Sequence, residues 1–392
     1  MSVDIKEIQQ DLRAAKVDGW LFYDFRGRDP IAHRLLKLLP TMRTRRWFYF
    51  IPAKGAPKKL LHKIETAALE TLPGSALYYA GQKELQANLK KLLAGAKKVA
   101  MQYSPNNEIP YVAMVDAGTI EQVRFAGVKV VSSADLVQKY EACWTPQQLA
   151  SHRAAGAAID RIVADAFKLA AARVREKKSL TEYELKQFIL SEFAAAGIVA
   201  DDGPDVAVNS NASDPHYGPT PEKSAPIREG DFLLLDVWGK TKQAGSVYYD
   251  ITWVGYLGAK VPEKFTKVFN VVRAARDKAV ALILLRVATG QSLQGWEVDK
   301  AARDVIEKAG YGKYFFHRTG HNIGEAIHGN GANMDGLETH DVRRLIPRTC
   351  TSVEPGIYLK DFGIRSEVDV YIGEVEAHVT GAVQTEVLAL LA

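Results

Sequence analysis

The fold is decided by residues 232–254, which read FLLLDVWGKTKQAGSVYYDITWV. Two apolar runs flank a polar connector that contains a glycine, and this pattern predicts an antiparallel hairpin. Each run carries one aspartate, Asp236 in the first and Asp250 in the second. A turn centred near Gln243 would place the two aspartates directly opposite one another, with Cβ atoms about 5 Å apart. Burying unpaired carboxylates costs several kcal/mol, so the stretch predicts a bound cation.

A second pair of apolar runs repeats this arrangement near the end of the chain. Residues 352–358 read SVEPGIY, and residues 364–370 read IRSEVDV. A turn at the midpoint between the runs would place Glu354 opposite Glu367. Arg365 lies two residues before Glu367, so it shares the face of that glutamate and can bond a carboxylate or an acidic group of a substrate.

Histidines are concentrated between the two carboxylate pairs. Residues 317–329 read HRTGHNIGEAIHG and hold His317, His321 and His328, while His216 lies in a further loop, DPHYGP. Any one of these residues alone is more often structural than functional. Together, four carboxylates and an imidazole are the ligand types of a two-metal hydrolytic site, and oxygen-rich ligands favour Mn²⁺.

The remaining sequence predicts two domains, as expected for 392 residues. Alternating helix and strand patterns before residue 102 predict a small α/β domain. The segment CWTP, residues 143–146, joins it to the rest, with Pro146 at the first position of a long helix. Further helices expected at 181–196, 262–288 and 296–309, together with strands that arrive in hairpins, predict an α+β second domain.

Composition excludes several classes of protein. The apolar content of 47% and charged content of 25% are those of a globular chain, and no apolar run reaches the length of a membrane span. Residues 1–145 carry 22 Lys and Arg against 14 Asp and Glu, but no aromatic residues interleave the basic clusters, which favours a solvated surface over a nucleic-acid site. Two lone cysteines and a polar N-terminus favour the cytoplasm.

On these residues the chain resembles a known enzyme family. The order Asp, Asp, His, Glu, Glu, within the motifs DIT, TGH, VEPG and IRSE, makes residues 143–392 similar to the pita-bread metallopeptidases. That family includes prolidases, aminopeptidase P and methionine aminopeptidases. Residues 1–142 resemble the creatinase-type N-terminal domain. The resemblance implies an α+β pita-bread catalytic domain preceded by a smaller α/β domain, and a homodimer.

The resemblance also implies a role for each candidate residue. Two divalent ions per subunit, Mn²⁺ first and Zn²⁺ or Co²⁺ as alternatives, would be bound by five ligands: Asp236, Asp250, His321, Glu354 and Glu367. Glu354 would also handle the proton of a hydroxide that bridges the two metals. His216 and His328 would act in catalysis and line the proline pocket, and His317 and Arg365 would bind substrate.

The implied activity is hydrolysis of the peptide bond that precedes proline, most directly in Xaa-Pro dipeptides. The alternatives are an aminopeptidase P acting on longer Xaa-Pro peptides and a non-catalytic relative that only binds peptides. One departure from the family bears on this choice. His340 takes the place where dipeptidases tend to carry an arginine for the substrate carboxylate, and Arg343 and Arg344 lie nearby as substitutes.

Overall fold

The computed structural model describes residues 4–39, 41 and 43–392. The chain divides into two compact units, Met1–Glu141 and Ala142–Ala392. The sequence placed the boundary between residues 142 and 143, and the creatinase-type character of the first unit stays a prediction.

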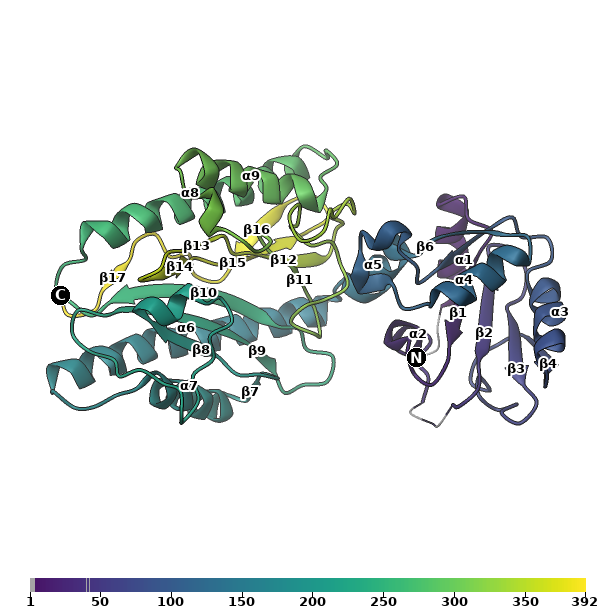
Figure 1. Cartoon of the computed structure of the whole chain (residues 1–392), viewed down its shortest axis with the longest axis horizontal. Helices are drawn as coiled ribbons and strands as arrows, with labels where there is room; N and C mark the ends of the chain where they lie inside the picture. The colour runs from purple at the N-terminus through teal and green to yellow at the C-terminus, as the bar shows by residue number, and fades with distance from the viewer. Residues whose placement is uncertain (1–3, 40, 42) are drawn as a thin grey trace. The chain divides into compact units, whose positions relative to one another are not determined.

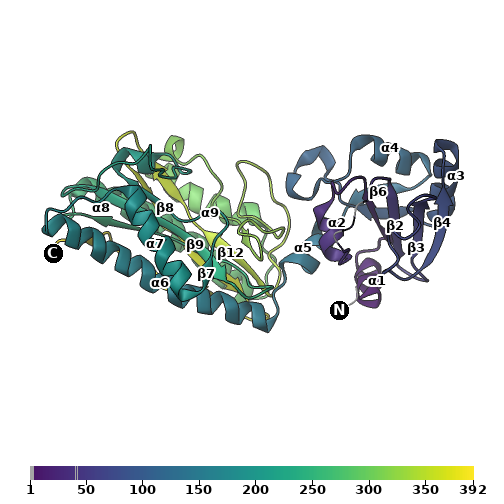
Figure 2. The same ribbon diagram turned by 90° about the horizontal axis from the view of Figure 1, so that it is seen from below.

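The first unit is a six-stranded sheet with helices on both faces (Figure 2). The strands follow the order β4-β3-β2-β1-β5-β6. Apolar side chains of α1, α2 and α5 form a core on one face of the sheet, and those of α3 and α4 form a core on the other. The bounds of these elements are α1 Ile5–Ala14, β1 Gly19–Asp24, α2 Pro30–Leu35, β2 Trp47–Pro52, β3 Lys58–His62, β4 Ser75–Tyr79, α3 Gln82–Leu92, β5 Lys98–Met101, α4 Ala117–Phe125, β6 Lys129–Ser132 and α5 Ala134–Ala142.

Two long helices of the second unit begin where the sequence predicts, and the second also ends there. A capping box at Thr145 starts α6 (Pro146–Arg175), because its side chain satisfies a free N–H of the first turn. Thr181 does the same for α7 (Glu182–Ala196), which ends at Gly197 in the left-handed conformation, with φ 70°. Figure 1 shows α6 and α7 on one side of the strands of this unit, and α8 and α9 on the other.

The strands of the second unit form a five-stranded sheet, a four-stranded sheet and a two-stranded ribbon. The remaining elements of this unit are β7 Ile198–Val199, β8 Asp205–Val208, β9 Phe232–Thr241, β10 Tyr249–Tyr256, α8 Glu263–Ala288, α9 Gly295–Lys308, β11 Asn322–Ile323, β12 Thr349–Val353, β13 Gly356–Tyr358, β14 Gly363–Arg365, β15 Val368–Ile372, β16 Ala377–Thr380 and β17 Leu388–Ala389. The strand β8 lies in residues 201–226, a segment rich in glycine, proline and asparagine in which the sequence predicted no strand.

The predicted hairpin of β9 and β10 is present, but its register differs from the prediction. Asp236 pairs with Thr252, and Asp250 pairs with Trp238, so the two aspartates are offset by two residues and are not directly opposite. The turn is centred one residue later than Gln243, which shifts the register by two. Because side chains alternate with a period of two, both aspartates still project from the same face.

The second predicted hairpin has the expected register but is interrupted at both glutamates. Val353 pairs with Val368 in the β12–β15 ladder, and Gly356 pairs with Arg365 in the β13–β14 ladder. The two ladders continue one another in register, so Glu354 and Glu367 lie across from one another in the gap, as predicted. Pro355 contributes to the break because it has no N–H to donate.

Along β9 and β10, successive side chains point alternately into the hydrophobic core and toward the candidate site. Leu233, Leu235 and Ile251 pack into the core that contains α6 and α7. Asp236 and Asp250 occupy alternate positions and therefore face away from those helices, toward the strands that carry the glutamates. In the described part of the chain, no helix combines the length and the apolar character needed to cross a membrane.

Candidate metal centre and active site

Most of the residues predicted from the sequence converge on one cavity of about 680 Å³. Its lining contains all five predicted metal ligands and four of the five predicted substrate-binding residues, which are His216, His317, His328 and Arg365. These residues come from β9, β10, the β12–β15 region and two loops. The fold therefore brings together side chains that are as far apart in the sequence as His216 and Glu367.

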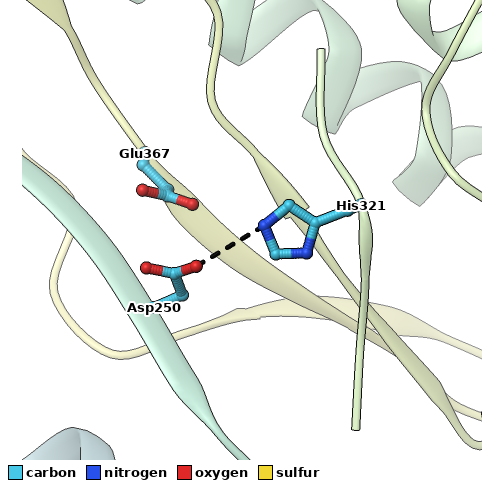
Figure 3. Close-up of side chains that lie close together, drawn as sticks. All are labelled: Asp250, His321 and Glu367. Carbon is cyan, nitrogen blue, oxygen red and sulfur yellow. Dashed lines mark ion pairs between the residues drawn. The ribbon is translucent and has the colours of Figure 1, made fainter. Parts of the chain in front are cut away.

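Three of the predicted ligands form a tight cluster at the bottom of the site. Ligand atoms of Asp250, His321 and Glu367 lie within 4.8 Å of one another (Figure 3). The side chains are almost wholly enclosed, with exposures of 5%, 3% and 2%. His321 Nε2 lies 3.5 Å from Asp250 Oδ2 and 3.4 Å from Glu354 Oε1, so Glu354 adjoins the same cluster.

The electrostatics of this cluster call for a cation. Burial, followed by repulsion from neighbouring carboxylates, raises the pKa of Asp250 and Glu367 well above their usual values. Burial likewise raises the pKa of Glu354. Asp250 Oδ1 and Glu367 Oε1 are buried and have no hydrogen-bond partner. Orphaned buried carboxylate oxygens are costly, and a divalent ion would satisfy both the charge and the open coordination. The residues present therefore fit a metal centre.

His321 presents the correct nitrogen to this centre. Burial lowers its pKa to about 4, so the imidazole is neutral near pH 7. Its Nδ1 lies 3.3 Å from the carbonyl oxygen of Asn322, which can only accept, so Nδ1 carries the proton. Nε2 then has a free lone pair that points toward Asp250 and Glu354, as a metal ligand requires. The ring of His328 meets that of His321 edge-on, with centroids 4.4 Å apart.

Asp236, the remaining predicted ligand, is held by Arg365. The guanidinium donates to Asp236 Oδ2 from NH2 and to Thr252 Oγ1 from Nε at 3.0 Å. Thr252 Oγ1 also lies 2.9 Å from Asp236 Oδ1 and 2.7 Å from Glu367 Oε2. The threonine of the DIT motif thus links the two hairpins, because its hydroxyl reaches a carboxylate on each.

A chain of hydrogen bonds continues from Arg365 to His317. Arg365 NH1 donates to Tyr358 Oη at 3.0 Å, and Tyr358 Oη lies 2.7 Å from His317 Nε2. His317 Nδ1 lies 2.6 Å from the carbonyl oxygen of Arg318, so Nδ1 donates and Nε2 accepts from tyrosine. Burial lowers the pKa of His317 to about 3, consistent with a neutral ring. Both ring nitrogens are therefore engaged within the protein, and its contact with substrate stays a prediction.

The loop that carries His216 is anchored by Glu182, a wholly buried residue at the start of α7. Glu182 Oε1 accepts from the backbone N–H of Val208, and Oε2 accepts from that of Ala225 at 2.7 Å. Oε2 also accepts from the Tyr217 hydroxyl at 2.7 Å. One carboxylate therefore fixes both ends of the segment, and His216 is placed at the cavity by a rigid connection.

A close backbone approach places His321. A Cβ on Gly320 would lie 2.0 Å from the carbonyl oxygen of Ser352, so only glycine fits at this position. The approach brings the loop against β12, where the Ser352 hydroxyl accepts from the N–H of His321 at 3.0 Å. The glycine in the TGH motif is thus a packing requirement of the metal centre.

Three residues that the sequence analysis did not single out also belong to the site. Asp369 is wholly buried, and its Oδ2 accepts from the Asp250 N–H at 2.9 Å. Asp205 pairs with Asp236 across β8 and β9, lines the cavity, and has a pKa raised by burial to about 7. Arg318 lines the cavity beside His317. The sequence could have indicated Asp205 and Asp369, because each is a polar residue at a strand position that faces the interior.

The predicted carboxylate-binding residues lie elsewhere. His340 is exposed, is absent from the cavity lining, and packs its ring against Trp296 with centroids 5.1 Å apart. Arg343 is buried in an ion pair with Asp341, 2.6 Å between NH2 and Oδ2, and is also absent from the lining. Arg344 is exposed and does not line the cavity. The structure thus brings none of the three to the metal cluster.

A comparison with known families identifies the second unit. The model of metallopeptidase family M24 matches residues 150–374, more than half of the chain and most of the second unit. The chain belongs to metallopeptidase family M24. The match includes all five predicted ligands, and it confirms the resemblance and the pita-bread fold predicted from the sequence.

Individual proteins are also similar to this chain in sequence, and a solved structure has the same fold. The chain is 27% identical over 335 residues, 83% of its length and 80% of the relative, to the "Probable dipeptidase PepE" of Mycobacterium tuberculosis. It is 32% identical over 163 residues, 41% of the chain and 40% of the relative, to the Xaa-Pro dipeptidase of Lactobacillus helveticus. The crystal structure of dipeptidase PepE from Mycobacterium ulcerans superposes with a TM-score of 0.72 at 22% identity, covering 98% of this chain and 96% of that one.

Proposed function

We propose that this M24 metallopeptidase hydrolyses the peptide bond before proline in Xaa-Pro dipeptides. The observation that carries the proposal is the enclosed cluster of Asp250, His321 and Glu367, beside Glu354 and Asp236, in a cavity lined by further histidines. A relative of the same family is named an Xaa-Pro dipeptidase, and another is named a probable dipeptidase. The cytoplasmic location and the homodimer expected from the sequence stay predictions.

The five carboxylate and imidazole ligands would hold two divalent ions, with Mn²⁺ as the expected species. When bound, such ions lower the pKa of water and polarise the scissile carbonyl. The unpartnered oxygens of Asp250 and Glu367 support this assignment, because nothing else in the described structure satisfies them.

Glu354 and His328 supply the proton chemistry in this proposal. Burial raises the pKa of Glu354, which suits it to take a proton from the attacking water and return it to the proline nitrogen. His328 is exposed at the cavity, where loss of solvent around the ring and the nearby positive charges lower its pKa. Its neutral ring would donate one N–H to the developing oxyanion. His216 lines the same cavity and would contact the peptide around the proline ring.

Hydrolysis of a peptide panel tests the proposal. The purified protein, loaded with Mn²⁺, is assayed on Ala-Pro, Ala-Ala and Ala-Pro-Ala. We expect cleavage of Ala-Pro and little cleavage of Ala-Ala. Faster cleavage of Ala-Pro-Ala than of Ala-Pro would replace the dipeptidase with an aminopeptidase P, and equal cleavage of Ala-Ala and Ala-Pro would refute specificity for proline.

A further inference from the structure

We propose that Arg318 recognises the free carboxylate of the dipeptide and so restricts the enzyme to substrates that end at proline. The inference rests on the proposed function and adds a residue to it. A dipeptide carries its carboxylate one residue beyond the scissile carbonyl. The recognising group must therefore lie in the same cavity as the metal cluster, within one residue's reach of it.

The cavity lining offers two arginines and no lysine among the described residues, and these arginines have different surroundings. Arg365 is buried behind the cluster, where Asp236, Thr252 and Tyr358 accept its hydrogen bonds. Its guanidinium is part of the framework that positions the ligands. Arg318 is half-buried and comes from a loop at the cavity wall, three residues before His321.

The positive charge of Arg318 lies among the histidines of the site. Arg318 follows His317 in the chain, precedes His321 by three residues, and lines the same cavity as both and as His328. A cation on the wall that these histidines share lies beside the place where the scissile bond would sit. The same charge favours an anionic group at that end of the cavity.

The backbone of Arg318 is fixed on both sides. Its N–H donates to Glu338 Oε1 at 2.8 Å, and its carbonyl oxygen accepts from His317 Nδ1 at 2.6 Å. The network from Arg365 through Tyr358 to His317 thus ends on the carbonyl of Arg318. A side chain on so constrained a backbone loses less freedom when it binds, which strengthens recognition of a carboxylate.

Phe316, two residues before Arg318, suits the proline ring to which the substrate carboxylate is attached. Phe316 lines the cavity, is 53% exposed, and packs against Tyr358 with ring centroids 5.2 Å apart. An exposed aromatic face next to an arginine matches a pyrrolidine ring next to a carboxylate. The three residues that the sequence offered for this task, His340, Arg343 and Arg344, do not reach the cavity.

The test compares Ala-Pro with its C-terminal amide, which differs from it in the charge of the carboxyl group. We expect the wild type to prefer the free acid. Arg318→Met should raise KM for Ala-Pro about tenfold to a hundredfold, which is the worth of a charge-assisted hydrogen bond. The same variant should leave kcat for Ala-Pro and KM for the amide nearly unchanged. Arg318→Lys should restore part of the preference, because it keeps the charge without the bidentate fork.

Arg161→Met, an exposed residue of α6, is the matched control and should leave both substrates unaffected. Melting temperature and metal content of each variant establish that it is folded and loaded. A wild type that cleaves Ala-Pro, combined with an Arg318→Met variant that keeps the wild-type preference for acid over amide, overturns the inference alone. A wild type that cleaves neither substrate overturns the proposed function, and the inference with it.

Discussion

Asp250→Asn should change the stability of the protein in opposite directions with and without metal. In the metal-free protein, the substitution removes one of two buried carboxylates whose oxygens lie within 4.8 Å. In the loaded protein, it removes a ligand. We therefore expect the variant to be as stable as the wild type or more stable in chelator, and clearly less stable in Mn²⁺.

The magnitudes follow from the geometry. Two unit charges 4.8 Å apart, which is the upper limit of separation in the cluster, repel by about 3.5 kcal/mol at an effective dielectric constant of about 20. Protonation relieves part of this repulsion, because burial and neighbouring carboxylates raise the pKa of Asp250 and Glu367, so the gain in the free energy of unfolding should be of this order or smaller. Metal at about a thousand times its Kd stabilises the wild type by about 4 kcal/mol. For a unit of this size that corresponds to a Tm increase of about 8–16 °C.

The assay is thermal unfolding in chelator and in a Mn²⁺ titration, with metal content measured by elemental analysis. The wild type should show the full increase in Tm with Mn²⁺, and Asp250→Asn little or none. Asp361→Asn makes the same chemical change at an exposed position of the second unit and should behave as the wild type. The ligand assignment is refuted if Asp250→Asn binds as much metal as the wild type and gains the same Tm.

Three further predictions concern residues around the cluster. His216→Ala and His328→Ala should each lower kcat at least tenfold while metal content stays at the wild-type level; loss of metal in either would make that histidine a ligand. His152 is a wholly buried residue of α6 whose Nε2 lies 3.9 Å from Asp369 Oδ2. Burial lowers its pKa in the folded protein to about 4, against about 6.5 unfolded, so its contribution to stability is complete above pH 6.5 and is lost as the pH falls toward 4. Between pH 6.5 and pH 4, the free energy of unfolding measured in urea should therefore fall by up to about 3 kcal/mol more for the wild type than for His152→Gln. Equal decreases in the two proteins would contradict the lowered pKa of His152. Gly320→Ala should cost about 3 kcal/mol or more of stability, or metal binding, because its Cβ would meet a carbonyl oxygen at 2.0 Å; Gly324→Ala, with no atom nearer than 3.9 Å, should be tolerated as far as packing is concerned.

The predictions that succeeded rest on local signals. Thr145 with Pro146, and Thr181 with Gly197, mark helix ends through hydrogen bonds that lie within a few residues. The turn between Glu354 and Glu367 is short, so the midpoint of the two apolar runs gives the register directly. The residues that produce these features are close together in the chain, so a single sequence is enough to predict them.

The features that were missed depend on distant contacts. The connector between Asp236 and Asp250 contains several possible turn centres, and the choice among them depends on which strand faces meet, not on the connector itself. Strand β8 was not predicted, because it is short and surrounded by glycine, proline and asparagine, yet it pairs with β9 along its whole length. His340 was favoured by its position in the sequence, but its ring packs on Trp296 outside the cavity.

The alternation of side chains along β9 and β10 has a consequence for where this chain can change length during evolution. An insertion or deletion of one residue inside the paired part of β10 would turn Asp250 toward α6 unless a bulge absorbed it, whereas a change in the connector, residues 242–248, can be absorbed by the loop. The same holds for the strands that flank Glu354 and Glu367, whose ladders share one continuous register. Active homologues should therefore vary in length in the loops between these strands, and a change of one residue inside a paired strand should be accompanied by a bulge.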